Sequence, residues 1–213
     1  GYARLYPVHS ANAASAELTV RGLISDISQL MGLTNPIKPA VVKSDQGSAF
    51  MSNYFQEFLG TKQIAFHPAT PYTPQQNSFV ERMWGVRFGT ARVLLANSNL
   101  PPRFHAYALQ TANWIHNRLP MASRGNMSPY FILTRQPASL EYLRSFGCLC
   151  RVLDPVGQRT GDRHFNDRGQ LALYLGPSEV SPSAIVYMLS SRTVKTAAHV
   201  LFYEDHFPGI DGM

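Results

Sequence analysis

Long apolar runs are missing from this sequence of 213 residues: none approaches the roughly 18 residues that a membrane-spanning helix needs. The first residues also lack the basic and apolar regions of a signal peptide, and no internal repeat or low-complexity tract is present. With 45% hydrophobic and 15% charged residues, the chain can bury one sizeable core or two small ones. These features predict a globular, intracellular protein without a membrane partner.

Cysteine is also scarce. Only Cys148 and Cys150 occur, two residues apart in a segment that we expect to be a strand. Side chains at this spacing share one face of a strand, where apolar packing suits them better than a disulfide. A metal site would need further ligands nearby, so we predict two buried free thiols.

Acidic residues are outnumbered by basic ones, 13 to 19, which gives a net charge of +6 and a pI near 9.5. Fifteen of the basic residues are arginine, whose planar guanidinium binds a phosphate through two parallel hydrogen bonds. This balance favours an anionic partner, and nucleic acid is the first candidate.

Strand and helix patterns alternate along the first 120 residues, which is typical of an α/β fold. An apolar stripe on the long helix after Pro74 should face the core, because its members recur at spacings of three or four residues. The stripe comprises Val80, Trp84, Phe88, Ala91 and Leu95. The expected strands are 2–8, 40–43 and 64–66, and the other expected helices are 13–31, 52–61 and 104–117.

Short β-rich segments separated by turns follow residue 146, and they predict a small barrel. They cover 147–153, 171–175, 185–189 and 194–203. The expected domains are therefore an α/β part over 1–120, a connector over 121–145 and an all-β part over 146–207.

The first 120 residues contain only five carboxylates: Glu17, Asp26, Asp45, Glu57 and Glu81. Glu17, Asp26 and Glu57 lie on predicted helices, where we expect them to face water. Asp45 and Glu81 differ, because Asp45 ends a strand beside a glycine turn and Glu81 lies on a helix entered through a proline-rich loop. Strand ends are where α/β folds place ligands. Each candidate also has an ordinary structural explanation. Asp before Gly is common in turns, and Ser78 with Glu81 matches the S-x-x-E capping box that begins helices.

The two candidates stand in a longer pattern. Asp45 lies in a Ser-Asp-Gln-Gly turn, 35 residues separate it from Glu81, and 71–77 read Pro-Tyr-Thr-Pro-Gln-Gln-Asn. These residues resemble the catalytic core of integrases. The segments 117–120 (Asn-Arg-Leu-Pro), 146–148 (Phe-Gly-Cys) and 200–205 resemble the copia-type retrotransposon integrases within Gag-Pol polyproteins, and the resemblance covers nearly the whole chain.

The resemblance implies an RNase H-like core, here without its first two strands, followed by an SH3-like barrel. It implies metal-dependent polynucleotidyl transfer, with 3′-end processing and then strand transfer of element DNA into target DNA. Asp45 and Glu81 would be catalytic ligands of Mg²⁺ or Mn²⁺, since these ions prefer oxygen donors. The DNA-binding positions would be Tyr72, Gln75, Gln76, Asn77, Arg82, Arg87 and Arg92.

The family's first aspartate would lie upstream of these residues, so we expect the chain alone to be inactive. Two positions depart from the pattern: Ser78 replaces a frequent glycine, and Gly85 stands where a basic residue is frequent. The resemblance also implies a homo-multimer acting on DNA ends in the nucleus, and otherwise a cytoplasmic particle.

Two other functions fit the same residues. A catalytically dead, integrase-derived module could keep the fold and the basic surface for nucleic-acid binding or assembly. An RNase H-type nuclease could use the same fold, although the segments after the core favour an integrase.

Overall fold

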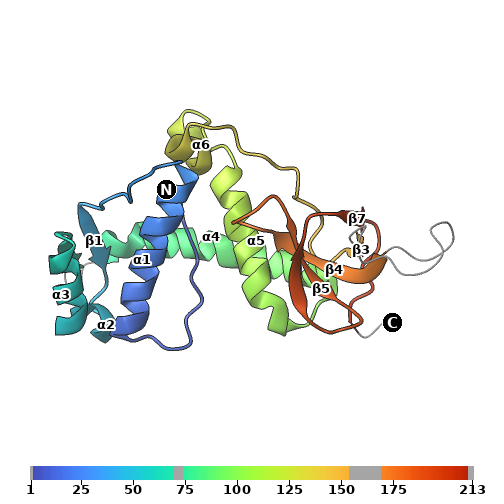
Figure 1. Ribbon diagram of the computed structural model, residues 1–213, viewed down its shortest axis with the longest axis horizontal. Coiled ribbons are helices and arrows are strands. Elements are labelled where there is room, and N and C mark those ends of the chain that lie inside the picture. Colours follow the sequence, from blue (N-terminus) through green and yellow to red (C-terminus); the bar gives the residue numbers. More distant parts are fainter. Residues whose placement is uncertain (1, 70–73, 154–168, 211–213) are drawn as a thin grey trace. The chain divides into compact units, whose positions relative to one another are not determined.

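The structure is a computed structural model that describes residues 2–69, 74–153 and 169–210 (Figure 1); the side chains of 74–77 and 79 are outside that description. The helices are α1 (Ala13–Leu30), α2 (Ser48–Met51), α3 (Asn53–Thr61), α4 (Pro74–Ser98), α5 (His105–Arg118) and α6 (Pro129–Thr134), with 3-10 turns η1 (Pro102–Phe104) and η2 (Ala122–Arg124). The strands are β1 (Val41–Ser44), β2 (Ala65–Pro68), β3 (Leu149–Leu153), β4 (Gly169–Pro177), β5 (Ala184–Met188), β6 (Val194–Ala197) and β7 (Val200–Tyr203).

Two compact units make up the chain, and the boundary between them falls inside α4. The N-terminal unit comprises Tyr2–Gly85 with Tyr130–Gln136, and the C-terminal unit comprises Val86–Pro129 with Pro137–Met213. The expected division after residue 120 therefore does not coincide with these units.

The N-terminal unit is built on two parallel strands, β1 and β2, in a register that pairs Val42 with Phe66. Helix α1 begins at an N-cap in which the Asn12 side chain accepts a hydrogen bond from the backbone N–H of Ser15 at 2.9 Å. The core of the unit comprises Ala16, Phe55, Phe58, Leu59 and Ile64. This arrangement confirms the expected helix–strand alternation.

Residues 2–8 are not a strand, which corrects the prediction from their alternating pattern. They run beside α1, where the Asp26 carboxylate accepts hydrogen bonds from Arg4 at 2.8 and 3.0 Å and from the Tyr6 hydroxyl at 2.6 Å. A strand requires a paired neighbour, and 2–8 form no ladder with another described segment. Asp26 is therefore a structural anchor, although the sequence predicted a helix position facing water.

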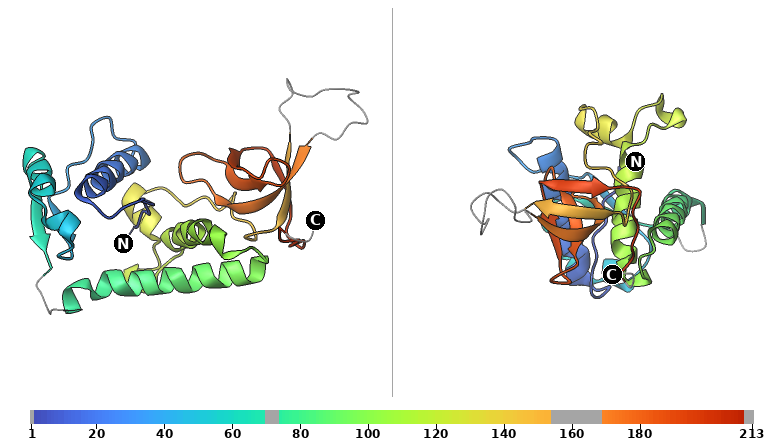
Figure 2. Two further views of the ribbon diagram at one scale, coloured as in Figure 1. Left: turned by 90° about the horizontal axis from the view of Figure 1, so that it is seen from below. Right: turned by 90° about the vertical axis from the view of Figure 1, so that its right-hand side faces the viewer.

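The C-terminal unit contains an antiparallel sheet with strand order β6-β5-β4-β3-β7. Only two residues connect β6 to β7, although these strands lie at opposite edges of the sheet. Three Cα steps span at most about 11 Å, whereas the edges of a flat five-stranded sheet would be about 19 Å apart. The sheet must therefore curl strongly, as Figure 2 shows, in the manner expected for a small barrel.

Alternate residues of β4 face two different cores, as the two-residue period of a strand requires. Leu173 and Leu175 pack in a cluster with Ala108 and Ala112 of α5, while Tyr174 packs in a second cluster with Cys150. Cys148 and Cys150 are fully buried free thiols, as predicted, and burial raises the pKa of each to about 12.

Only the later part of the predicted α4 stripe is correct. Ala91 is buried and Leu95 is packed against the core, but Val80 and Phe88 are 44% and 46% exposed. From residue 87 onward the buried side of α4 comprises 87, 91, 94, 95 and 98. It therefore includes position 87 in place of the predicted Phe88. None of the described helices is long and apolar enough to cross a membrane.

Candidate functional site

Asp45 lies at the carboxyl end of the parallel strand pair. Ser44, the last residue of β1, pairs with Pro68, the last residue of β2, so both strands end at the same edge. The backbone N–H of Ala69 donates to the Ser44 carbonyl at 2.8 Å, which extends the pairing one residue further. Asp45 is exposed at this edge, where the prediction from the sequence placed it.

The turn after β1 holds the Asp45 carboxylate in place. Its Oδ1 accepts the backbone N–H of Gly47 at 3.1 Å, and a Cβ at position 47 would lie 3.1 Å from the same oxygen. The Gln46 side chain donates to the Ala69 carbonyl at 3.1 Å, so the turn is tied to the end of β2. No described residue donates a hydrogen bond to Asp45 Oδ2, and this exposed oxygen is available to a cation.

Glu81 lies inside α4 and is exposed. The helix begins at Pro74, four residues before Ser78, so Ser78 is not its N-cap and the capping-box interpretation is wrong. The long helix expected after Pro74 begins at Pro74 itself, because proline is tolerated in a first helical turn. Glu81 therefore has no role in beginning this helix.

Asp45 and Glu81 belong to the same compact unit, but the described residues do not complete a metal centre around them. Within 2–69, 74–153 and 169–210, no three His, Cys, Asp or Glu side chains gather closely enough to hold an ion. The two carboxylates do fit Mg²⁺ or Mn²⁺ chemically, since both are exposed oxygen donors. They would form part of a site that needs at least one further ligand.

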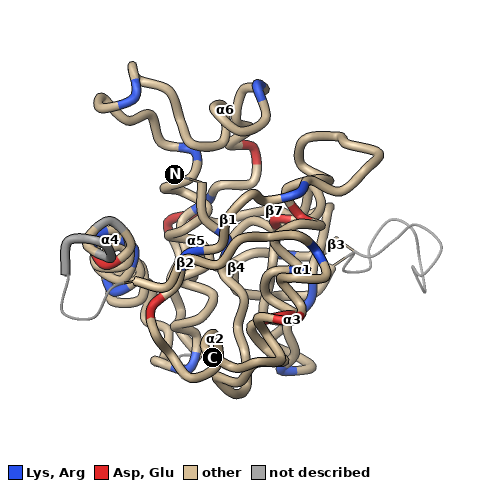
Figure 3. The backbone as a smooth tube through the Cα atoms, turned by 90° about the vertical axis from the view of Figure 1, so that its left-hand side faces the viewer, with Lys and Arg blue, Asp and Glu red and all other residues tan. Residues whose placement is uncertain are grey.

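The expected DNA-contacting residues divide into three groups. Tyr72 lies outside the described residues, and Gln75, Gln76 and Asn77 begin α4 with side chains that are not described. Arg82 and Arg92 are exposed on α4, as expected. In Figure 3 the tube of α4 carries basic residues together with an acidic one.

The structure corrects the expectation that Arg87 faces DNA. Arg87 is only 5% exposed, and its Nε donates to the Asn113 side chain of α5 at 2.7 Å. Arginines spaced by five residues on a helix are rotated by about 140° from one another, so 82, 87 and 92 cannot share one face. Arg87 therefore joins α4 to α5 within the C-terminal unit and does not face solvent phosphates.

The Asn-Arg-Leu-Pro motif at 117–120 also has a structural role. Asn117 is fully buried in the last turn of α5, and the Arg118 guanidinium stacks over the Trp114 ring at 3.7 Å. The contact of Arg118 with Trp114 lies within α5 and needs no ligand to explain it. The motif supports the resemblance but adds no residue to the site.

Sequence comparisons relate the chain to retroelement proteins, although no protein-family model matches it. It is 30% identical over 135 residues to the retrovirus-related Pol polyprotein from transposon TNT 1-94 of tobacco, covering 63% of this chain and 10% of that protein. It is 38% identical over 82 residues to the Pro-Pol polyprotein of simian foamy virus type 3, covering 38% of this chain and 6% of that protein.

The chain is a homologue of retroelement Pol polyproteins. This confirms the resemblance predicted from the Asp45 and Glu81 pattern. The chain spans about a tenth or less of the length of these relatives, which are long polyproteins.

Solved integrase structures resemble the chain at lower similarity. The catalytic core of HTLV-2 integrase, solved with magnesium in a trimeric form, is 22% identical with a TM-score of 0.43, over 59% of this chain and 71% of that one. The simian T-cell lymphotropic virus intasome, in complex with PP2A regulatory subunit B56 gamma, is 19% identical with a TM-score of 0.46. The match covers 87% of this chain and 62% of that one. Likeness of this extent assigns no activity to the chain.

Proposed function

We propose that this chain is part of an integrase that joins retroelement DNA to target DNA by metal-dependent polynucleotidyl transfer. The observation that carries the proposal is Asp45 at the shared carboxyl edge of β1 and β2, followed after 35 residues by the exposed Glu81, in a homologue of Pol polyproteins. Both carboxylates are exposed, and neither forms an ion pair with a described basic residue.

Asp45 and Glu81 would hold Mg²⁺ or Mn²⁺ together with a further carboxylate encoded upstream. When bound, such ions neutralise the charge on the attacking and leaving oxygens of a phosphodiester. In the turn from Ser44 to Gly47, Asp45 Oδ1 accepts a backbone N–H, which would leave Oδ2 to bind the ion. This hydrogen bond would orient the carboxylate before an ion binds.

Arg82 and Arg92 would contact DNA phosphates from the exposed sides of α4, and Tyr72, Gln75, Gln76 and Asn77 would contact DNA ahead of them. Arg87 is left out of this set because it is buried against Asn113. We further propose that the parent protein acts as a homo-multimer in the nucleus, since the reaction must join two element ends to chromosomal DNA. The trimeric form of the HTLV-2 integrase core agrees with such assembly.

The test is strand transfer on a short duplex with the element's end sequence, using the Pol product that contains this chain with its upstream residues. Asp45→Asn and Glu81→Gln should each reduce product by at least about 100-fold, because each removes one anionic ligand. Glu57→Gln on α3 is the matched control, since Glu57 is an exposed carboxylate outside the site. Product that persists in Asp45→Asn would refute the assignment.

A binding-only module is the second candidate, and the observation that favours it is the absence of a three-ligand cluster among the described residues. The same assay separates the two functions. A folded parent protein that binds the element end but yields no product with either Mg²⁺ or Mn²⁺ would establish the binding-only function.

A further inference from the structure

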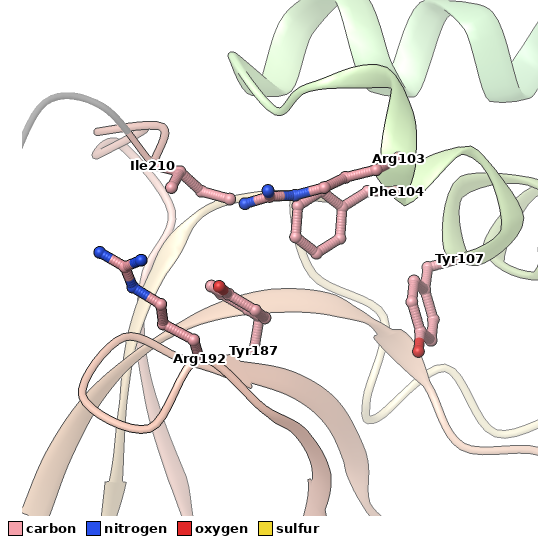
Figure 4. A pocket seen from close by; sticks show the side chains of 6 residues that line it. All are labelled: Arg103, Phe104, Tyr107, Tyr187, Arg192 and Ile210. Atoms are coloured by element: carbon pink, nitrogen blue, oxygen red, sulfur yellow. The ribbon is translucent and has the colours of Figure 1, made fainter.

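A cavity of about 590 Å³ lies within the C-terminal unit, where η1 and α5 face β5 and the turn that follows it (Figure 4). Its volume is in the range of small-ligand pockets, which hold about 300–1,000 Å³. Among the described residues that line it, none is acidic and two are arginines. The lining comprises Arg103, Phe104, Tyr107, Tyr187, Arg192 and Ile210.

Two guanidinium groups approach this cavity from different elements. Arg103 extends from η1, while Arg192 extends from the turn between β5 and β6. Figure 4 shows the Arg103 guanidinium above the Tyr187 hydroxyl and the Arg192 guanidinium to its left. Three groups able to donate hydrogen bonds therefore line one cavity.

Neither guanidinium is neutralised by a carboxylate of the described residues. Both arginines are exposed, and across the described part of the chain neither forms an ion pair with a carboxylate. The Tyr187 hydroxyl likewise has no hydrogen-bond partner there. An oxyanion with several acceptor oxygens matches this set, because each guanidinium presents a planar fork of donors.

Three aromatic rings and the Ile210 side chain form the rest of the described wall. Phe104 and Tyr187 are 4% and 7% exposed and pack edge to face with centroids 5.2 Å apart, which gives the cavity a rigid base. Arg103 lies over the Phe104 ring at 5.4 Å. Tyr107, one turn further along the helical segment, is only half-buried and presents its ring at the other end.

Phosphate-binding arginines beside an accessible aromatic ring are typical of sites for unpaired nucleotides, because every base has a face that can stack. An acidic peptide would use the two arginines but not the aromatic wall, and duplex DNA would present no free base. The combination of groups therefore favours a single strand.

We propose that this cavity binds one nucleotide of a single-stranded nucleic acid, with the phosphate between Arg103 and Arg192 and the base against Tyr107. The site is separate from Asp45 and Glu81, and it rests on the proposed function only in expecting a nucleic-acid ligand. It would hold an unpaired end or displaced strand of the DNA on which the enzyme acts.

The experiment is fluorescence anisotropy of labelled oligo-dT and oligo-U with the 213-residue chain over a series of salt concentrations. The variants are Arg103→Gln and Arg192→Asn, alone and together. Asparagine suits position 192 because the backbone there has φ of 54°, a conformation that Asn tolerates. The matched control is Lys195→Gln on β6, which removes one positive charge from the same hairpin outside the cavity.

Loss of a charge-assisted phosphate contact should weaken binding by at least about tenfold in the double variant. The slope of log affinity against log salt should become shallower by about 0.7, the value for one phosphate of a single strand. Tyr107→Ala should weaken binding by about fivefold or more through lost stacking, while Tyr107→Phe should bind normally. Thermal melting of each variant confirms that it remains folded.

Three results would overturn the proposal: no oligonucleotide binding by the unsubstituted chain at low salt, a double variant that binds as tightly as Lys195→Gln, or arginine-dependent binding of a poly-glutamate peptide in place of oligonucleotide. Weaker binding of oligo-dT or oligo-U by the double variant supports the proposal. Because the readout is oligonucleotide binding and not strand transfer, Glu57→Gln should leave it unchanged, and failure here and failure of strand transfer are separate outcomes.

Discussion

Gly176 is the position at which the contact between α5 and the sheet is most sensitive to an added methyl group. Its φ is +130°, and a Cβ there would lie 2.1 Å from Thr111 Oγ1. That hydroxyl also donates to the Leu175 carbonyl at 3.0 Å. Gly176→Ala must therefore strain the backbone and displace Thr111 at once.

The expected cost is about 4 kcal/mol. An L side chain in so sparsely populated a backbone conformation costs roughly 1–3 kcal/mol, overpacking of a buried contact roughly 1–3 kcal/mol, and the lost hydrogen bond about 1 kcal/mol. For a chain of this length, each kcal/mol lowers Tm by about 2–4 °C, so a fall of about 8–16 °C is expected.

Urea denaturation followed by circular dichroism measures this cost, with Gly125→Ala as the matched control. Gly125 belongs to the same unit and has φ of +61°, but a Cβ there would lie 3.9 Å from the nearest neighbouring atom, Cε of Met127. The control therefore strains the backbone without crowding a neighbour. Thr111→Ala should recover part of the stability lost in Gly176→Ala. A Gly176→Ala cost equal to that of Gly125→Ala would refute the crowding argument.

Three further predictions concern titratable groups. Asp26→Asn should destabilise the N-terminal unit by about 2 kcal/mol in urea denaturation, because charge-assisted hydrogen bonds from Arg4 and Tyr6 are lost; an unchanged midpoint would contradict this. Cys148 and Cys150 should resist a thiol reagent at pH 8 until the chain is unfolded, since burial raises the pKa of both to about 12; fast labelling of the native chain would disprove it. Burial, and then the charge of Arg87, lower the pKa of His116 from 6.5. The unfolded chain therefore binds this proton more readily, and stability should fall as pH drops below 6.5. His116→Gln should make the free energy of unfolding less dependent on pH in urea denaturation between about pH 5 and 7. An unaltered pH profile would rule out a contribution of His116.

Local patterns in the sequence were sufficient wherever a property depends on near neighbours. The helix–strand alternation, the buried face of Cys148 and Cys150, and the place of Asp45 at a strand end all follow from periodicity and turn chemistry over a few residues. The spacing of Asp45 and Glu81 likewise led to the Pol homology without any coordinates.

Only the tertiary structure decided which of two neighbouring helix faces is buried. Arg87 lies against Asn113 while Phe88 is exposed, and the period of α4 cannot choose between them because that choice depends on where α5 docks. Residues 2–8 show the same limit, since a strand pattern forms no strand without a paired neighbour.

The cavity of Arg103 and Arg192 could not be predicted at all from the sequence. These arginines are 89 positions apart in the sequence, and only the fold brings them to the same cavity. Local sequence thus determined the elements and the candidate metal ligands, whereas long-range packing determined which basic residues remain available to a ligand.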